Sequence, residues 1–114
     1  MIYIKTSLIK WVTRMVIKFT QHSIDRLLER TSLSTYELQN IYKTKKTVPL
    51  GIEQSSNRQH DLFYSMMDDQ CYVGVRDIKT LELITILPVS YHKAWKVSED
   101  TEYLAMELSM QSNA

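Results

Sequence analysis

The chain has 114 residues, of which 44% are hydrophobic and 24% charged, and its formal net charge is +1. This length and composition are those of one compact globular domain and exclude a disordered or fibrous protein. A single cysteine excludes an intrachain disulfide framework and a cysteine-based zinc ribbon. Two glycines are too few for the glycine-rich loops that bind nucleotide phosphates. We therefore expect one domain over residues 1–114.

The charge is distributed unevenly along the chain. Residues 1–50 carry nine lysines and arginines against three acidic residues, whereas residues 51–114 carry five against ten. Such an asymmetry can mark a basic face for nucleic acid. The alternative is that the two halves pack together and their charges intermix on the surface.

The N-terminal stretch has neither the pattern of a targeting segment nor that of a membrane segment. Basic residues interrupt every apolar run up to Lys18, so neither a signal peptide nor a membrane span is predicted. Residues 1–14 are expected to be an N-terminal extension, with Met15 as an alternative start of translation. Nothing in the sequence argues for export, and we expect a cytoplasmic protein without a membrane partner.

The first elements are a strand and a helix. Residues 15–19 predict a short strand, and Thr20 then stands where a helix N-cap is expected. The helix is expected to end near Arg30. Its apolar residues, at the spacing of one helix face, are Ile24, Leu27 and Leu28.

A second helix begins with a stronger signal. Ser34 and Glu37 form a capping box, and Leu33 and Leu38 occupy the positions of a hydrophobic staple. The apolar face of this helix consists of Leu38, Ile41 and Tyr42. Its end is basic, where cations complement the helix dipole, through Lys43, Lys45 and Lys46.

The rest of the chain changes to the period of strands. Residues 53–59 predict a polar loop, and three strand-like runs follow at 60–66, 70–76 and 81–87. The short connections between them predict an antiparallel meander of three or four strands. Alternation places His60, Leu62, Tyr64 and Met66 on one face of their strand, and Tyr72, Gly74 and Arg76 on one face of the next. Cys71, within a strand, is expected to be a core residue.

The last element is a helix that begins at Ser98, with Leu104 and Leu108 on its buried side. The element order is therefore β-α-α, then an antiparallel β-meander, then a C-terminal helix. This order predicts an α+β domain with its helices on one face of an antiparallel sheet.

The first helix carries a polar stripe that is a candidate for chemistry. His22, Arg26 and Arg30 follow one another at intervals of four residues, so they share one side of the helix. A neutral imidazole in the first turn can accept a proton, and the two guanidiniums can hold a phosphate. The alternative is an ordinary solvated helix face.

Two more histidines stand at strand ends. His60 begins the first strand of the meander and His92 follows the last one, and strand ends of a small sheet often open onto one cleft. Arg76 and Lys93 lie on or beside the sheet and are candidate phosphate contacts. The three histidines lack the spacing of a metal site, so no metal is expected.

Residues 21–26 read Q-H-x-x-D-R, followed by Thr-Tyr at 35–36 and K-x-K at 43–45. This pattern resembles the two-helix start of the RegB-type phage endoribonucleases, members of the RelE-like superfamily of small RNases and toxins. The resemblance covers residues 15–46 in motif and the remainder in element order alone. It implies a RelE-like fold, an RNA substrate, no cofactor, and roles in cleavage for His22 and Arg26.

One position departs from that family. A second functional histidine is expected near the end of the second helix, and this chain has Tyr42 there. The second catalytic role therefore falls to His60, to His92 or to Tyr42 itself.

The resemblance leads to a specific mechanism. His22 takes the proton of a 2′-hydroxyl, which attacks the adjacent phosphate, and His60 or His92 protonates the leaving oxygen. The expected RNA-binding residues are Arg30, Lys43, Lys45, Lys46, Arg76 and Lys93, with Arg26 beside the phosphate. Such a protein is expected to act as a toxin or as a regulator carried by a phage or mobile element, with a cognate antitoxin or the ribosome as a further partner.

Two other classes of function remain open. The same basic helices fit a non-catalytic regulator that binds nucleic acid or a protein. A structural adaptor that forms homodimers through its C-terminal helix is the third interpretation.

Overall fold

The structure, a computed structural model, describes residues 16–93 and 96–111, so the expectations for residues 1–14 lie outside the described residues. The elements are β1 (Lys18–Phe19), α2 (Gln21–Arg30), α3 (Thr35–Lys43), β2 (Val48–Glu53), β3 (Arg58–Ser65), β4 (Gln70–Asp77), β5 (Glu82–Pro88), the 3-10 turn η1 (Val89–Tyr91) and α4 (Glu99–Ser109). The fold is α+β, as predicted. Both N-terminal helices are where the sequence indicated them.

The sheet has five strands in the order β1-β5-β4-β3-β2. Strands β2 to β5 pair antiparallel with their neighbours in sequence, whereas β1 pairs parallel with β5. The expectation of a purely antiparallel sheet is therefore wrong, and the sheet is mixed. The reason is that helices α2 and α3 carry the chain away from β1 and across the sheet to its far edge, so that β1 lies beside the last strand and not beside the next one.

Strand β2 was not predicted. The sequence placed a loop over residues 53–59, but β2 ends at Glu53 and β3 already begins at Arg58. The sequence did not indicate a strand here, because Pro49 and Gly51 are both unfavourable in a central strand. Strand β2 is an edge strand with a register shift between these two residues, and there they are tolerated.

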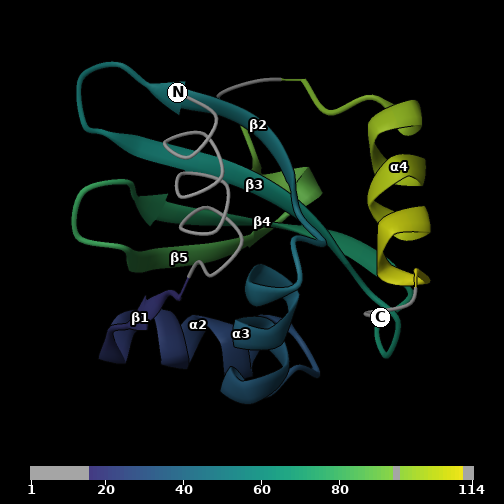
Figure 1. Cartoon of the computed structure of the whole chain (residues 1–114), viewed down its shortest axis with the longest axis horizontal. Coiled ribbons are helices and arrows are strands. Elements are labelled where there is room, and N and C mark those ends of the chain that lie inside the picture. Colours follow the sequence, from purple (N-terminus) through teal and green to yellow (C-terminus); the bar gives the residue numbers. More distant parts are fainter. Residues whose placement is uncertain (1–15, 94–95, 112–114) are drawn as a thin grey trace, which may run out of the picture.

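Helices cover both faces of the sheet, so the expectation of helices on one face is wrong. In Figure 1, α2 and α3 lie together on one side, and α4 lies apart from them against the strands. The core under α2 and α3 contains Leu27, Leu38, Tyr42, Phe63, Tyr72, Leu83 and Ile86, and the core under α4 contains Leu62, Cys71, Val73, Val75 and Ala105. Since β3 and β4 carry apolar side chains on both faces, helices must shield both faces of the sheet from water. We call the two faces of the sheet the α2–α3 face and the α4 face, after the helices that pack on them.

Two helices present different sides from those expected. In α4 the fully buried residue is Ala105, while Leu104 is exposed and Leu108 only partly buried. In α2 the buried residues are Ser23 and Leu27, while Leu28 points to solvent. Helical spacing identified the apolar residues in each case, but packing against the sheet decided which side turned inward.

The helix starts follow the sequence closely. Ser34 accepts a hydrogen bond from the backbone of Glu37, whose carboxylate accepts one from the backbone of Ser34, so the predicted capping box is confirmed. Thr20 and Ser23 form a second reciprocal cap at the start of α2. Ser98 caps α4 through the backbone of Thr101.

A single carboxylate ties the loop between α2 and α3 to the turn between β3 and β4. Asp68 accepts hydrogen bonds from the backbone and hydroxyl of Ser32, at 2.9 and 2.7 Å, and from the hydroxyl of Ser65 at 2.8 Å. Burial alone would raise the pKa of Asp68, but these bonds outweigh it and hold that pKa below its ordinary value.

Candidate functional site

Three side chains form a continuous hydrogen-bonded chain on the α4 face. Glu53 Oε1 lies 2.7 Å from His60 Nε2, and His60 Nδ1 lies 2.8 Å from His92 Nε2. The two imidazole rings meet edge to face, with centroids 4.9 Å apart. A carboxylate joined to two imidazoles in this way can accept, hold and pass on a proton.

A bulge in β2 brings Glu53 into this group. Val48 pairs with Leu62 and Pro49 with Asp61, but the register then shifts so that Gly51 pairs with His60. Without the shift Glu53 would point to the other face, because successive strand residues alternate. After the shift, Glu53 lies on the face of His60, which is its diagonal neighbour across the hairpin.

The turn after β5 brings His92 to the same place. Pro88 ends the strand, and η1 reverses the chain, with the backbone N–H of His92 donating to Val89 O at 3.0 Å. Val89 packs in the core under α4. The turn therefore directs His92 over the α4 face, where it meets a residue 32 positions earlier in the sequence.

The contacts determine how protons are shared in the cluster. Two nitrogens at 2.8 Å need one proton between them, so His60 and His92 cannot both present an N–H to each other. Hydrogen bonds from the Ser56 hydroxyl and from His60 hold the pKa of Glu53 below its ordinary value, and the charge of Arg58 lowers it further. Glu53 is therefore a carboxylate at neutral pH.

The accessible end of the cluster is Glu53. Its side chain is 38% exposed, whereas His60 is 4% and His92 is 8% exposed. Two cations lie on the surface beside the cluster: Arg58 pairs with Glu53 in the strand register, and Lys93 follows His92 directly. Both side chains are exposed and can meet an anionic ligand.

His22 does not join the other two histidines. It is exposed on α2, which packs on the opposite face of the sheet from His60 and His92. A single active site with His22 as base and either of the others as acid is therefore not formed. The sheet itself separates the two groups.

The two arginines of the same helix are already engaged. Arg26 forms an exposed ion pair of 2.7 Å with Glu29. Arg30 donates to Ile86 O at 2.7 Å, and its guanidinium lies 5.6 Å from the centroid of the Tyr91 ring. Arg30 thus links the end of α2 to β5. Arg26 and Arg30 therefore make separate contacts and do not form one shared phosphate site with His22.

The basic residues after α3 have different environments. Lys43 and Lys45 are exposed and can meet phosphate. Lys46 donates through Nζ to the carbonyls of Ser109 and Gln111, so it holds the last turn of α4, where a cation complements the helix dipole. Its role here is structural.

Tyr42 and Arg76 belong to a buried network in the core of the α2–α3 face. Tyr42 donates to Asp61 Oδ2 at 3.2 Å, and Arg76 Nε donates to the same oxygen at 2.9 Å. Burial and the neighbouring carboxylate of Asp61 raise the pKa of Tyr42 well above its ordinary value. Tyr42 is therefore no acid or base at neutral pH, and Arg76, only 6% exposed, presents little surface to RNA.

Sequence reasoning missed Glu53 and Arg58, because it placed both in a loop. One signal was available, namely Ser-Ser-Asn at 55–57 between them, which is typical of a tight turn and hence of a hairpin. The shift of register that turns Glu53 toward His60 had no such signal.

Residues 16–93 and 96–111 contain no group of three or more His, Cys, Asp or Glu side chains that could hold a metal ion. No helix in residues 16–93 or 96–111 is long and apolar enough to cross a membrane. The sequence matches no known family model and no curated protein, and the structure matches no solved structure. The RelE-like assignment therefore stays a prediction from residues 15–46 and from element order.

Proposed function

We propose that the protein is a metal-independent endoribonuclease whose reacting groups are Glu53, His60 and His92. The observation that carries this proposal is their hydrogen-bonded chain, with a carboxylate at its exposed end. Cleavage of RNA beside a 2′-hydroxyl needs one base, one acid and a cation for the phosphate, and the α4 face provides all three. The Q-H-x-x-D-R resemblance supports RNA as the substrate.

The chemistry begins at Glu53. Its carboxylate takes the proton of the 2′-hydroxyl, and the resulting oxygen attacks the adjacent phosphorus. The bond from phosphorus to the 5′ oxygen breaks, and that oxygen receives a proton from the protonated His60–His92 pair. The products are a 2′,3′-cyclic phosphate and a free 5′-hydroxyl.

His60 acts between the other two residues. In this proposal the two imidazoles together carry one positive charge before the reaction, and they are both neutral after the leaving oxygen has taken its proton, with one proton still shared at 2.8 Å between His60 Nδ1 and His92 Nε2. Glu53 Oε1 meanwhile continues to accept from His60 Nε2. His60, with both ring nitrogens bonded, thus positions the acid and supplies its proton.

The phosphate is held by exposed cations. Arg58 and Lys93 lie beside the cluster, and a guanidinium binds phosphate oxygens through two parallel hydrogen bonds. Lys93, which the sequence predicts to bind RNA, keeps that role in this proposal, and Arg58 joins it. His22, on the other side of the sheet, has no part in this mechanism.

The test is cleavage of a single-stranded RNA oligonucleotide by the purified full-length chain in EDTA. We expect fragments that end in a 2′,3′-cyclic phosphate by mass spectrometry, and no cleavage of the matching 2′-deoxy oligonucleotide. Glu53→Gln and His92→Gln should each lower the rate about 10²–10⁴-fold, the usual contribution of one general acid or base. Thermal unfolding monitored by circular dichroism verifies that both variants fold.

His22→Ala is the matched control, because it removes an exposed imidazole from the opposite face. Cleavage by Glu53→Gln and His92→Gln at the parent rate would overturn the proposal. So would RNA that binds but yields no fragments, an outcome that assigns the protein to the non-catalytic regulators.

A further inference from the structure

Two clefts adjoin each other on either side of Tyr64, away from the histidine cluster. The first, which we call the apolar cleft, has a volume of about 300 Å³ and lies between α3, the end of β3 and the last turn of α4. The second, the acidic cleft, has a volume of about 340 Å³ and lies between the β3–β4 turn and the first half of α4. Tyr64 lines both, so one ligand can occupy both.

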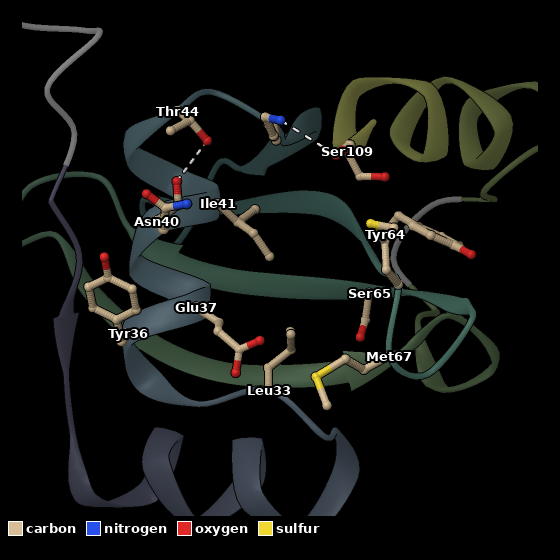
Figure 2. Close-up of a pocket in the computed structure, with 12 residues that line it drawn as sticks. Leu33, Tyr36, Glu37, Asn40, Ile41, Thr44, Tyr64, Ser65, Met67 and Ser109 are labelled. Carbon is tan, nitrogen blue, oxygen red and sulfur yellow. Dashed lines mark hydrogen bonds between the residues drawn. The ribbon is translucent and has the colours of Figure 1, made fainter. Parts of the chain in front are cut away.

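The apolar cleft is lined by apolar and polar side chains, and its exposed large apolar residues are Tyr36, Met66 and Met67. Its one cationic lining residue, Lys46, donates through Nζ to the carbonyls at the end of α4. In Figure 2, Ile41 reaches into the cleft from α3, and Leu33 and Met67 are among the other residues that line it. Tyr36 is 80% and Met67 67% exposed. Exposed aromatic and methionine side chains around a hollow are typical of protein-binding surfaces, because they bury much area and adapt to a partner.

The acidic cleft has carboxylates on both walls. Asp69 comes from the β3–β4 turn, and Glu99 and Glu102 come from α4. No lysine or arginine is among the described residues that line it, and none of these three forms an ion pair within the described part of the chain. Tyr103 adds an exposed aromatic ring, whose face attracts a cation.

The position of the carboxylates is only partly explained by helix stability. Acidic residues in the first turn of α4, including Glu99 and Glu102, complement its dipole. Asp69 lines the cleft from a different element and gains nothing from that dipole, and its Oδ1 accepts a hydrogen bond from the Tyr64 hydroxyl. The combination of two acidic walls with an aromatic ring therefore points to a cationic ligand.

We propose that the paired clefts bind a basic, amphipathic segment of another protein. Its apolar side chain fills the apolar cleft, and its lysine or arginine lies between Asp69, Glu102 and the ring of Tyr103. Charge complementarity selects this occupant, because the same carboxylates repel RNA phosphates and anionic lipid headgroups. A small cation alone would leave the apolar cleft empty.

This surface is independent of the proposed catalytic site. Tyr64 and His60 lie near opposite ends of β3, about 13 Å apart along the strand. A partner on the paired clefts can therefore be present whether or not the histidine cluster cleaves RNA.

The test uses a fluorescein-labelled peptide of leucine and lysine, patterned as an amphipathic helix of 16 residues, with a leucine–glutamate peptide of the same pattern for comparison. Binding to the full-length chain is measured by fluorescence anisotropy. We expect saturable binding of the basic peptide that weakens with added salt, and no binding of the acidic one.

Two pairs of variants locate the binding. Glu102→Lys should raise the Kd at least about tenfold, whereas Glu107→Lys, the same charge change on an exposed residue of α4 outside the clefts, should leave it within about twofold. Met67→Ser should also weaken binding, and Leu28→Ser, which changes an equally exposed apolar residue on α2, should not.

Three results would overturn the proposal. The first is an equal effect of each variant and its control, which would place the peptide elsewhere. The second is equal binding of the acidic peptide. The third is self-association in sedimentation experiments that Met67→Ser abolishes, because it would make a second copy of this chain the occupant.

Discussion

Gly74 provides a quantitative test of the core, because the hydroxyl of Tyr42 occupies the space where a Cβ atom would lie. A Cβ built on Gly74 would come closer to Tyr42 Oη than real Cβ atoms come to any neighbour, while lying 3.5 Å from Tyr42 Cζ and 3.6 Å from Leu83 Cδ1. Only the hydroxyl is in the way, and that hydroxyl donates to the buried Asp61. Gly74→Ala must therefore displace Tyr42 and strain or break this bond.

The expected cost can be estimated from the two effects. Overpacking a core by one methyl group costs about 1–3 kcal/mol, and disturbing a buried hydrogen bond about 1 kcal/mol more. We expect Gly74→Ala to lower the free energy of unfolding by about 2–4 kcal/mol. Tyr42→Phe alone should cost only about 0.5–1.5 kcal/mol, because Asp61 keeps its bonds to Arg76 and Gln59.

The double variant isolates the clash. With the Tyr42 hydroxyl removed, the nearest contacts of the added methyl group are ordinary, so Gly74→Ala should cost much less in the Tyr42→Phe background. Urea denaturation should be measured for the parent, the two single variants and the double variant. The double variant should lose less free energy of unfolding than the sum of the two single losses, by about 1 kcal/mol or more. An additive pair, with Gly74→Ala equally costly in both backgrounds, would refute the placement of Tyr42 against Gly74.

Two further predictions concern single side chains. Asp68→Asn should lower stability by about 1–2 kcal/mol near pH 7, since it weakens the bonds from Ser32 and Ser65. Because the pKa of Asp68 is lowered in the fold, this contribution is present above its ordinary value of 3.8 and is lost as the pH falls through the lower, folded value, so urea melts of parent and variant should converge at acid pH. Burial raises the pKa of Cys71 to about 11, so iodoacetamide at pH 8 should alkylate the native thiol about 100-fold more slowly than the urea-unfolded one, and equal rates would contradict its burial.

Local signals in the sequence predicted local structure well. The capping box of Ser34 and Glu37 defined the start of α3, because a cap depends on residues within one turn. Alternation also assigned His60, Leu62 and Tyr64 to one face of β3, which the contacts of Leu62 and Tyr64 under α4 confirm. Strand β2 was missed since Pro49 and Gly51 resemble a loop until their position at a sheet edge is known.

The site was less predictable, because it depends on tertiary arrangement. Spacing along α2 shows that His22, Arg26 and Arg30 share a side, but not that the sheet separates them from His60 and His92. The pairing of two histidines 32 residues apart requires the turn after Pro88, and the contact of Glu53 requires a bulge. Neither feature has a local sequence signature.

The central claim is that chemistry takes place at the Glu53–His60–His92 cluster and not at the exposed histidine of α2. The most direct measurement is the initial rate of RNA cleavage by His92→Ala and by His22→Ala, each compared with the parent protein under identical conditions. We expect His92→Ala to lose about 100-fold or more and His22→Ala to stay within about twofold of the parent. The reverse result, with His22→Ala silent and His92→Ala active, would contradict the account and restore α2 as the catalytic element.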